Sequence, residues 1–226
     1  MLAILFLIPV AVIYSVRTEL RQTVNRLFFV GGFMGLVAEY WYFQDYWRPP
    51  TLLGVARISV EDFLFGVGAV CLGSVIYKFV FRVKYLDSIY PKRYVLLCIY
   101  FVLGYSSMII FNGLLNINSI FVSSIAFLVI AGWMILLRKD LLVPSLLSGL
   151  LLSLFALMVY LILFDMLSPN FWDNYWLLSN TKYGIKILGN VPLTELLWYF
   201  SWGCLAGIAY DFTFGKGFNK RDTKHI

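Results

Sequence analysis

The sequence predicts an all-α polytopic membrane protein, a transmembrane helical bundle of about seven spans built from two parallel three-helix repeats. Hydrophobic residues make up 61% of the 226 positions, charged residues make up 13%, and the mean hydropathy is +0.83. A soluble domain of this length needs more polar residues to cover its surface. The apolar residues also fall into runs long enough to cross the hydrocarbon core of a bilayer, and one pattern of acidic and aromatic residues occurs twice.

The first apolar run covers residues 1–16 and ends directly before Arg17. No basic residue precedes it, so we expect an uncleaved anchor rather than a signal peptide with a basic start. Each later run is long enough for one span. The remaining expected helices are 27–43, 60–81, 94–115, 118–137, 141–164 and 191–213.

These runs divide the single membrane domain into parts. We expect one repeat at about 1–82 and a second at about 118–213, joined by a linking helix at 94–115. Residues 214–226 form a basic tail. Because the repeats begin four helices apart, an even number, they have the same orientation in the membrane and are parallel rather than inverted.

Basic residues gather on one side of this predicted bundle. With seven alternating spans, fourteen of the 18 Lys and Arg residues fall on the side that holds the carboxyl tail. The positive-inside rule makes that side cytoplasmic. We therefore expect a multi-pass protein of the cell membrane, with a non-cytoplasmic amino terminus and a cytoplasmic carboxyl terminus. The net charge of +6 then reflects topology, and we expect the lipid bilayer as a partner and no nucleic acid.

Acidic residues gather on the opposite side, several of them just inside predicted helices. An ionisable group within a span costs about 2.5 to 3.5 kcal/mol at the helix centre and less near the ends. Several such groups at one membrane face therefore indicate a function. The seven acids on this side are Glu39, Asp45, Glu61, Asp62, Asp165, Asp173 and Glu195.

Other chemistries find little support in the composition. The single histidine is His225 in the tail, which excludes Ser/His triads and histidine metal clusters. Cys71, Cys98 and Cys204 lie inside predicted spans without a CxxC motif, so we expect neither a disulfide framework nor a metal site. We expect no cofactor.

The duplicated pattern begins at Glu39 with "EYWYFQDYWRPP" and again at Asp165 with "DMLSPNFWDNYW". Each copy has an acid closing a helix, an aromatic loop, and an apolar helix that starts with an acid and ends near a tyrosine. Two helix starts of the same orientation reach the same membrane face, where their acids can share one cleft. At an offset of 133 residues the aligned pairs are Ser59 with Pro192, Glu61 with Thr194, Asp62 with Glu195, Phe65 with Trp198, Cys71 with Cys204 and Tyr77 with Tyr210.

At these residues the sequence resembles the membrane-integral lycopene cyclase domain family, whose members carry two helix-start motifs of the form Pro-x-Glu-Glu. The resemblance covers roughly residues 27–213 and includes "EYWYFQDYW" and "VPLTELLWYF". The motifs read Ser-Val-Glu-Asp at residues 59–62 and Pro-Leu-Thr-Glu at residues 192–195, so Thr194 stands where the family has an acid.

The resemblance implies a cofactor-independent isomerase that closes ionone-type rings on a linear carotenoid or another long isoprenoid. It also implies that the chain can form a homo- or heterodimer, because in this family the two halves of the protein can be separate chains that act as a pair. A protonated carboxylic acid can protonate a terminal alkene, and aromatic faces can stabilise the resulting cation. We expect Glu61, Asp62 and Glu195 to be catalytic, and Glu39 and Asp165 to support them. The expected cation-lining residues are Phe65, Trp198, Trp202, Trp47 and Trp176.

Other interpretations stay open. Ser59 and Asp62 also fit a capping box, Pro192 fits the start of any helix, and aromatic residues at span ends are typical of interfacial belts. A non-catalytic descendant that binds an isoprenoid or another membrane protein is the alternative function, which Thr194 permits. A small transporter or proton-conducting protein is a third, although such proteins usually carry ionisable groups nearer the midplane, and residues 94–137 contain no Asp, Glu, Lys, Arg or His.

Overall fold

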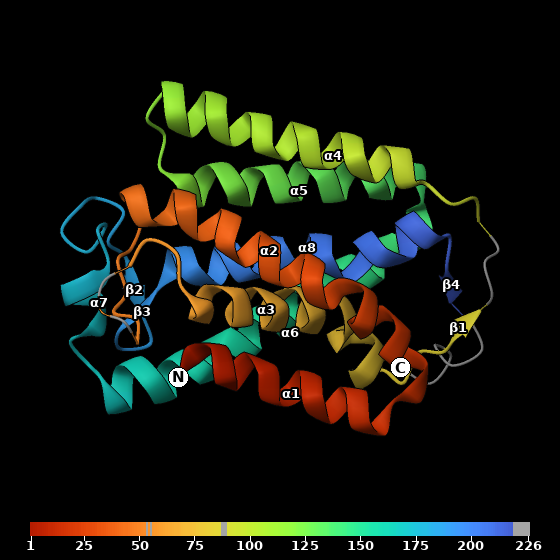
Figure 1. Cartoon of the computed structure of the whole chain (residues 1–226), viewed down its shortest axis with the longest axis horizontal. Helices are drawn as coiled ribbons and strands as arrows, with labels where there is room; N and C mark the ends of the chain where they lie inside the picture. The colour runs from red at the N-terminus through yellow and green to blue at the C-terminus, as the bar shows by residue number, and fades with distance from the viewer. Residues whose placement is uncertain (53, 55, 87–89, 219–226) are drawn as a thin grey trace.

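A computed structural model describes residues 1–52, 54, 56–86 and 90–218. Most of the predicted basic tail therefore lies outside the described residues. The described chain is almost entirely helical (Figure 1), and each of the seven expected apolar runs coincides with a long helix. The helices are α1 (Leu2–Val16), α2 (Arg21–Asp45), α3 (Val60–Val80), α4 (Tyr94–Ser107), α5 (Ser119–Leu137), α6 (Leu142–Tyr160), the short α7 (Phe171–Tyr175) and α8 (Leu193–Phe214).

Short helical turns extend or join these helices. Two π-helical segments continue α4 and α6, and two 3₁₀ turns connect α1 to α2 and α5 to α6. Successive long helices run in alternate directions (Figure 1). The π segments are Met108–Leu114 and Leu161–Leu167, and the 3₁₀ turns are Thr18–Leu20 and Lys139–Leu141.

Fewer helices meet the length and hydropathy of a membrane span than the seven expected runs. Within the described residues, four helices are long and apolar enough to cross a bilayer, or up to five if α1 and α2, which meet at a 115° bend, count as one broken span. The helix α8 is not among them, because it carries polar groups such as Glu195 and Asp211. These helices are compatible with a membrane protein. The count of seven spans stays a prediction.

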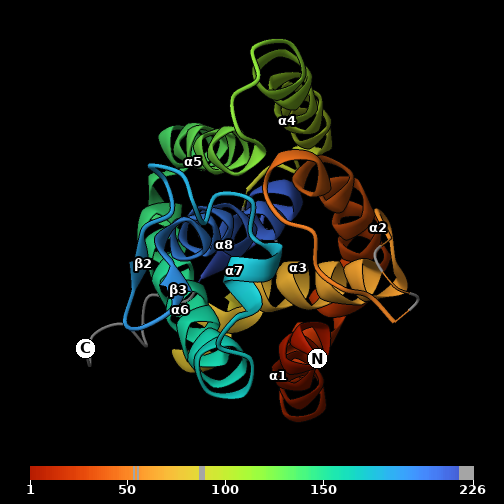
Figure 2. The same cartoon turned by 90° about the vertical axis from the view of Figure 1, so that its left-hand side faces the viewer.

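The packing of the first three helices resembles that of α5, α6 and α8. In the first group α2 and α1 both pack along α3, and in the second α6 and α5 both pack along α8. The two central helices, α3 and α8, contact each other. The helix α4, between the groups in sequence, lies outside them against α5 (Figure 2).

Glycines allow the closest helix contacts in both groups. A Cβ atom on Gly35 of α2 would lie 2.9 Å from the Gly66 Cα atom of α3. A Cβ atom on Gly203 of α8 would lie 2.8 Å from the Gly149 Cα atom of α6. Such distances leave no room for a side chain, so each pair lets two backbones touch.

Three contacts between α3 and α8 join residues that are 133 positions apart. The Trp202 indole nitrogen donates to the Ala69 carbonyl oxygen at 3.1 Å, and Lys78 Nζ lies 2.8 Å from Asp211 Oδ2. Between them, a Cβ atom on Gly73 would lie 3.0 Å from the Ala206 Cβ atom. The spacing of these contacts equals the offset of the sequence alignment.

Local signals set the ends of α3. Its amino terminus has a complete capping box, in which Ser59 Oγ accepts from the Asp62 backbone N–H and Asp62 Oδ2 accepts from the Ser59 N–H. At the other end, the Arg17 guanidinium donates to the Lys78 and Val83 carbonyl oxygens at 3.3 and 3.1 Å. Arg17, which directly follows α1, therefore caps the carboxyl end of α3.

Two loops meet at the end of the bundle that carries α7 (Figure 1). The loop after α2 and the loop after α7 are joined by backbone hydrogen bonds, Arg48 N–H to Tyr175 O at 2.9 Å and Leu177 N–H to Tyr46 O at 2.8 Å. Trp47 and Trp176 face each other in this bridge. In the same loop region β2 (Lys186–Ile187) pairs with β3 (Val191–Pro192), and β1 (Tyr85–Leu86) pairs with β4 (Gly217–Phe218) at the opposite end.

Candidate functional site

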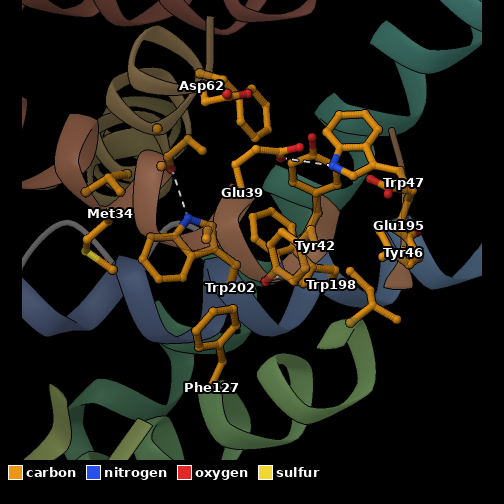
Figure 3. Close-up of a pocket in the computed structure, with 18 of the residues that line it drawn as sticks. Met34, Glu39, Tyr42, Tyr46, Trp47, Asp62, Phe127, Glu195, Trp198 and Trp202 are labelled. Carbon is orange, nitrogen blue, oxygen red and sulfur yellow. Dashed lines mark hydrogen bonds between the residues drawn. The ribbon is translucent and has the colours of Figure 1, made fainter. Parts of the chain in front are cut away.

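A chamber of about 80 Å³ lies between α2, α3, α5, α6 and α8, near the two joined loops. We call it the acid chamber, because three carboxyl groups line it, those of Glu39, Asp62 and Glu195. No Lys, Arg or His is among its lining residues. Figure 3 shows Glu39 between the other two acids, and Glu39 is close enough to interact electrostatically with both.

Glu39 lies in α2, six residues before the helix ends at Asp45, and is 5% exposed. Its Oε2 atom accepts a hydrogen bond from the Trp47 indole nitrogen at 3.0 Å (Figure 3). Its Oε1 atom is buried and meets no hydrogen-bond partner within the described part of the chain. A buried carboxyl oxygen without a partner is rare in folded proteins and calls for an explanation.

Glu195 lies in the first turn of α8 and is 6% exposed. Its Oε2 atom accepts from the Tyr160 hydroxyl of α6 at 2.6 Å, and that hydroxyl lies 3.0 Å from the Tyr199 hydroxyl. The neighbouring Thr194 is also buried, and its hydroxyl lies 3.0 Å from that of Tyr46. Thr194 thus fixes a tyrosine at the chamber wall.

Asp62 is half-buried and tied to the capping box. Its Oδ2 atom accepts from both the backbone N–H and the hydroxyl of Ser59, each at 2.7 Å. The capping function and a position at the chamber therefore coexist in one side chain. The two interpretations of this motif do not exclude each other.

Aromatic rings form much of the chamber wall. Trp198 and Trp202 stack with ring centroids 6.3 Å apart, and Phe127 of α5 contacts both rings at 6.1 and 5.0 Å (Figure 3). The Trp198 indole nitrogen donates to the Tyr42 hydroxyl at 2.7 Å, which fixes the ring orientation. Such rings present π faces that attract a cation.

Two of the expected acids lie elsewhere. Glu61, the neighbour of Asp62, points away from the chamber and accepts from the Leu52 backbone N–H at 2.6 Å. Asp165 is exposed and lies beside the turn between β2 and β3, where a Cβ atom on Gly189 would lie 2.8 Å from Asp165 Oδ1. Neither residue lines the acid chamber.

The other acids on this side have structural partners. Asp45 accepts from the Asn112 side chain at 2.5 Å and from the Ser119 backbone N–H at 2.9 Å, so it holds the junction between the α4 extension and α5. The Lys186 ammonium donates to Asp173 Oδ1 at 2.6 Å and holds the pKa of this exposed carboxyl below its usual value. These acids need no catalytic explanation.

Among the expected aromatic residues, four line the acid chamber and one does not. Trp176 is buried beside Trp47 in the loop bridge, outside the lining. Several other lining residues were not among those expected from the sequence. Tyr42 follows Glu39 by three positions, a helix-face spacing that could have identified it. Tyr160 and Phe127 come from distant helices, and no spacing links them to an acid. The four expected lining residues are Phe65, Trp198, Trp202 and Trp47.

Comparison with known proteins supports the resemblance in the second half of the chain. The lycopene cyclase family model matches residues 118–213, which confirms the family resemblance over this stretch. The match runs from the start of α5 nearly to the end of α8 and includes Glu195, whereas Glu39 and Asp62 lie outside it. No curated protein and no solved structure matches the chain.

Proposed function

We propose that this chain is a lycopene cyclase-like isomerase that closes an ionone-type ring on the end of a linear carotenoid within a membrane. The observation that carries the proposal is the acid chamber itself. Two buried carboxyls, Glu39 and Glu195, meet among aromatic rings with no basic residue in the lining. Chemistry that moves protons through a carbocation needs this combination.

In the proposed reaction, Glu39 is the acid. Its Oε1 atom has no hydrogen-bond partner among the described residues, and an ionised carboxyl is costly to bury without a cation. A protonated Glu39 can therefore direct its O–H into the chamber. The proton adds to the terminal carbon–carbon double bond and leaves a tertiary cation. A second double bond of the same chain then attacks that cation and forms the ring bond.

Glu195 takes the proton that the cyclised cation loses. The Tyr160 hydroxyl donates to Glu195 at 2.6 Å and stabilises a carboxylate there. The substrate gains one proton and loses one, so the reaction is an isomerisation without net oxidation. Glu195 then releases this proton to solvent and Glu39 takes up a solvent proton, which restores the starting state. Trp198, Trp202 and Phe65 present aromatic faces to the cation between these steps.

The same proposal includes the architecture. The chain would span the membrane several times as two parallel repeats, with the acid chamber toward the non-cytoplasmic face and the basic loops in the cytoplasm. The contacts at 133-residue spacing support a pseudo-twofold axis between α3 and α8. On this view Glu39 and Asp62 come from the first repeat and Glu195 from the second.

A non-catalytic isoprenoid-binding protein is the second candidate function. Thr194 favours it, because this residue replaces a family acid and its hydroxyl is already engaged by Tyr46. The acid chamber would then bind the end of an isoprenoid without converting it. Glu39 argues against this alternative, since it supplies a third carboxyl to the chamber from a different helix.

Expression in cells that accumulate lycopene separates the two functions. The cyclase proposal predicts a cyclised pigment by chromatography, which Glu195→Gln abolishes at equal protein level. Asp173→Asn is the matched control, because it makes the same acid-to-amide change at an exposed position outside the chamber. Unchanged lycopene in cells with abundant wild-type protein favours the binding function, and the test should then be repeated with a candidate partner chain.

A further inference from the structure

A second cavity of about 590 Å³ adjoins the acid chamber. We call it the apolar groove. It lies between α2, α4, α5 and α8, and six residues line both spaces, so the two share a wall. These residues are Met34, Ala38, Tyr42, Val70, Phe127 and Trp202.

The groove is apolar along its whole length. No charged residue lines it, and its polar groups are limited to serine, threonine and tyrosine hydroxyls and the Trp41 and Trp202 indole nitrogens. Along α8 it follows one helix face from Trp202 through Ala206 and Tyr210 to Phe214. At 1.5 Å per residue these twelve steps cover about 18 Å, and the distance from Glu195 to Phe214 is about 28 Å. The chamber and groove together run most of the length of α8.

The helix α4 closes the groove without filling it. At one end the Arg93 backbone N–H donates to the Thr213 carbonyl oxygen at 2.9 Å, and Tyr94 packs on Phe214. At the other end Trp41 and Tyr105 contact each other at 6.2 Å. Between these ends, lining residues such as Phe33 and Phe101 are 62% and 46% exposed, so the groove opens sideways on the outer surface of the bundle.

On the α1 and α6 side of the central helices, aromatic rings pack closely. There Phe6 of α1 is fully buried and contacts Phe65, Phe155 and Tyr199 at 5.2, 5.1 and 5.4 Å between ring centroids. These four rings come from α1, α3, α6 and α8, and two of them, Phe65 and Tyr199, also line the acid chamber. The α1 and α6 side is therefore closely packed at these rings, whereas the α2, α4 and α5 side holds the groove.

We propose that the apolar groove binds the extended chain of a linear polyisoprenoid whose one end lies in the acid chamber. This inference rests on the proposed function and adds where the rest of the substrate lies. A charge-free groove that adjoins the chamber and opens sideways suits a ligand that enters from the bilayer rather than from water. Because the groove holds the rest of the chain, the second end of the same molecule lies outside the chamber while the first end reacts.

The first test uses a cysteine in the groove and lycopene as the probe. Ala126 of α5 lines the groove, whereas its neighbour Ile125 is 62% exposed and does not. Ala126→Cys and Ile125→Cys would each be made in a full-length Glu195→Gln, Cys98→Ser background, which holds ligand without turnover. Added lycopene should slow maleimide modification at position 126 severalfold and leave position 125 unchanged.

A second measurement asks whether the groove is needed for binding. Ala126→Phe should weaken lycopene binding by about tenfold or more, because the new ring occupies the groove. Ile125→Phe, with the same side chain facing outward, should bind normally. The conservative cysteine variant keeps the test valid if the phenylalanine variant does not fold.

The outcomes separate this inference from the proposed function. If lycopene binds without protecting the cysteine of Ala126→Cys, the proposed binding of the chain in the groove is wrong, even if rings form. Lycopene that protects position 126 while the wild-type chain never forms a ring would support the groove and count against the cyclase. Absence of lycopene binding to the Glu195→Gln protein would overturn the inference directly.

Discussion

Lys78 Nζ lies 2.8 Å from Asp211 Oδ2 in the interior of the bundle, where the two side chains are 1% and 0% exposed. Lys78 also donates to the carbonyl oxygens of Ser74 and Gly207 at 2.6 and 3.1 Å. The two residues lie 133 positions apart on α3 and α8, so this ion pair joins the two central helices at the end opposite the acid chamber.

Removing one member of this pair should destabilise the fold more than removing both. Lys78→Met or Asp211→Leu alone leaves an unpaired buried charge, which costs about 3 to 5 kcal/mol. The double variant should recover much of that loss, because an apolar pair of similar volume needs no compensation. Thermal unfolding of the detergent-solubilised proteins measures the difference. Equal and additive losses would show that the two charges do not depend on each other.

Glu39 should matter more than Glu61, although the motif favoured Glu61. Glu39→Gln removes the buried acid of the chamber and should lower ring formation by about 10²- to 10⁴-fold. Glu61→Gln changes a carboxyl that holds the loop at Leu52 and should keep most activity. Pigment analysis at matched protein levels measures both. A dead Glu61→Gln with an active Glu39→Gln would reverse the assignment.

The loops at the acidic end should face outward. In a Cys98→Ser background, Asn180→Cys places an exposed thiol in the loop before β2, and Lys84→Cys places one at the opposite end. A membrane-impermeant maleimide should label position 180 in intact cells and position 84 only after lysis. The reverse pattern would contradict the orientation derived from the basic residues.

Rings should form one at a time if the groove holds the rest of the chain. A product with one ring should appear before any product with two, and fresh lycopene in excess should delay the second cyclisation by competing for the chamber. A time course of products from purified protein in bilayers tests this. Two-ring product from the earliest times, with no one-ring product released, would contradict a single open chamber.

The sequence predicted the helices well because the bilayer requires long apolar runs, and these stand out in a chain of this composition. The pairing of Asp62 with Glu195 also placed both residues at the same chamber. Asp165 and Glu61 could not be placed from sequence, because helix direction alone does not say which way a side chain turns. Tyr160 reaches Glu195 only through the packing of α6 on α8, and no local pattern encodes that contact.

Solvent deuterium tests the central claim most directly, since the account states that a buried carboxylic acid gives its exchangeable proton to the substrate and that the proton stays in the ring. Cyclisation of lycopene in deuterated buffer, followed by mass spectrometry of the product, should show one deuterium for each ring formed, and neither ring nor label with Glu39→Gln. A cyclised product that carries no deuterium would contradict acid-initiated ring closure in the chamber of Glu39 and Glu195.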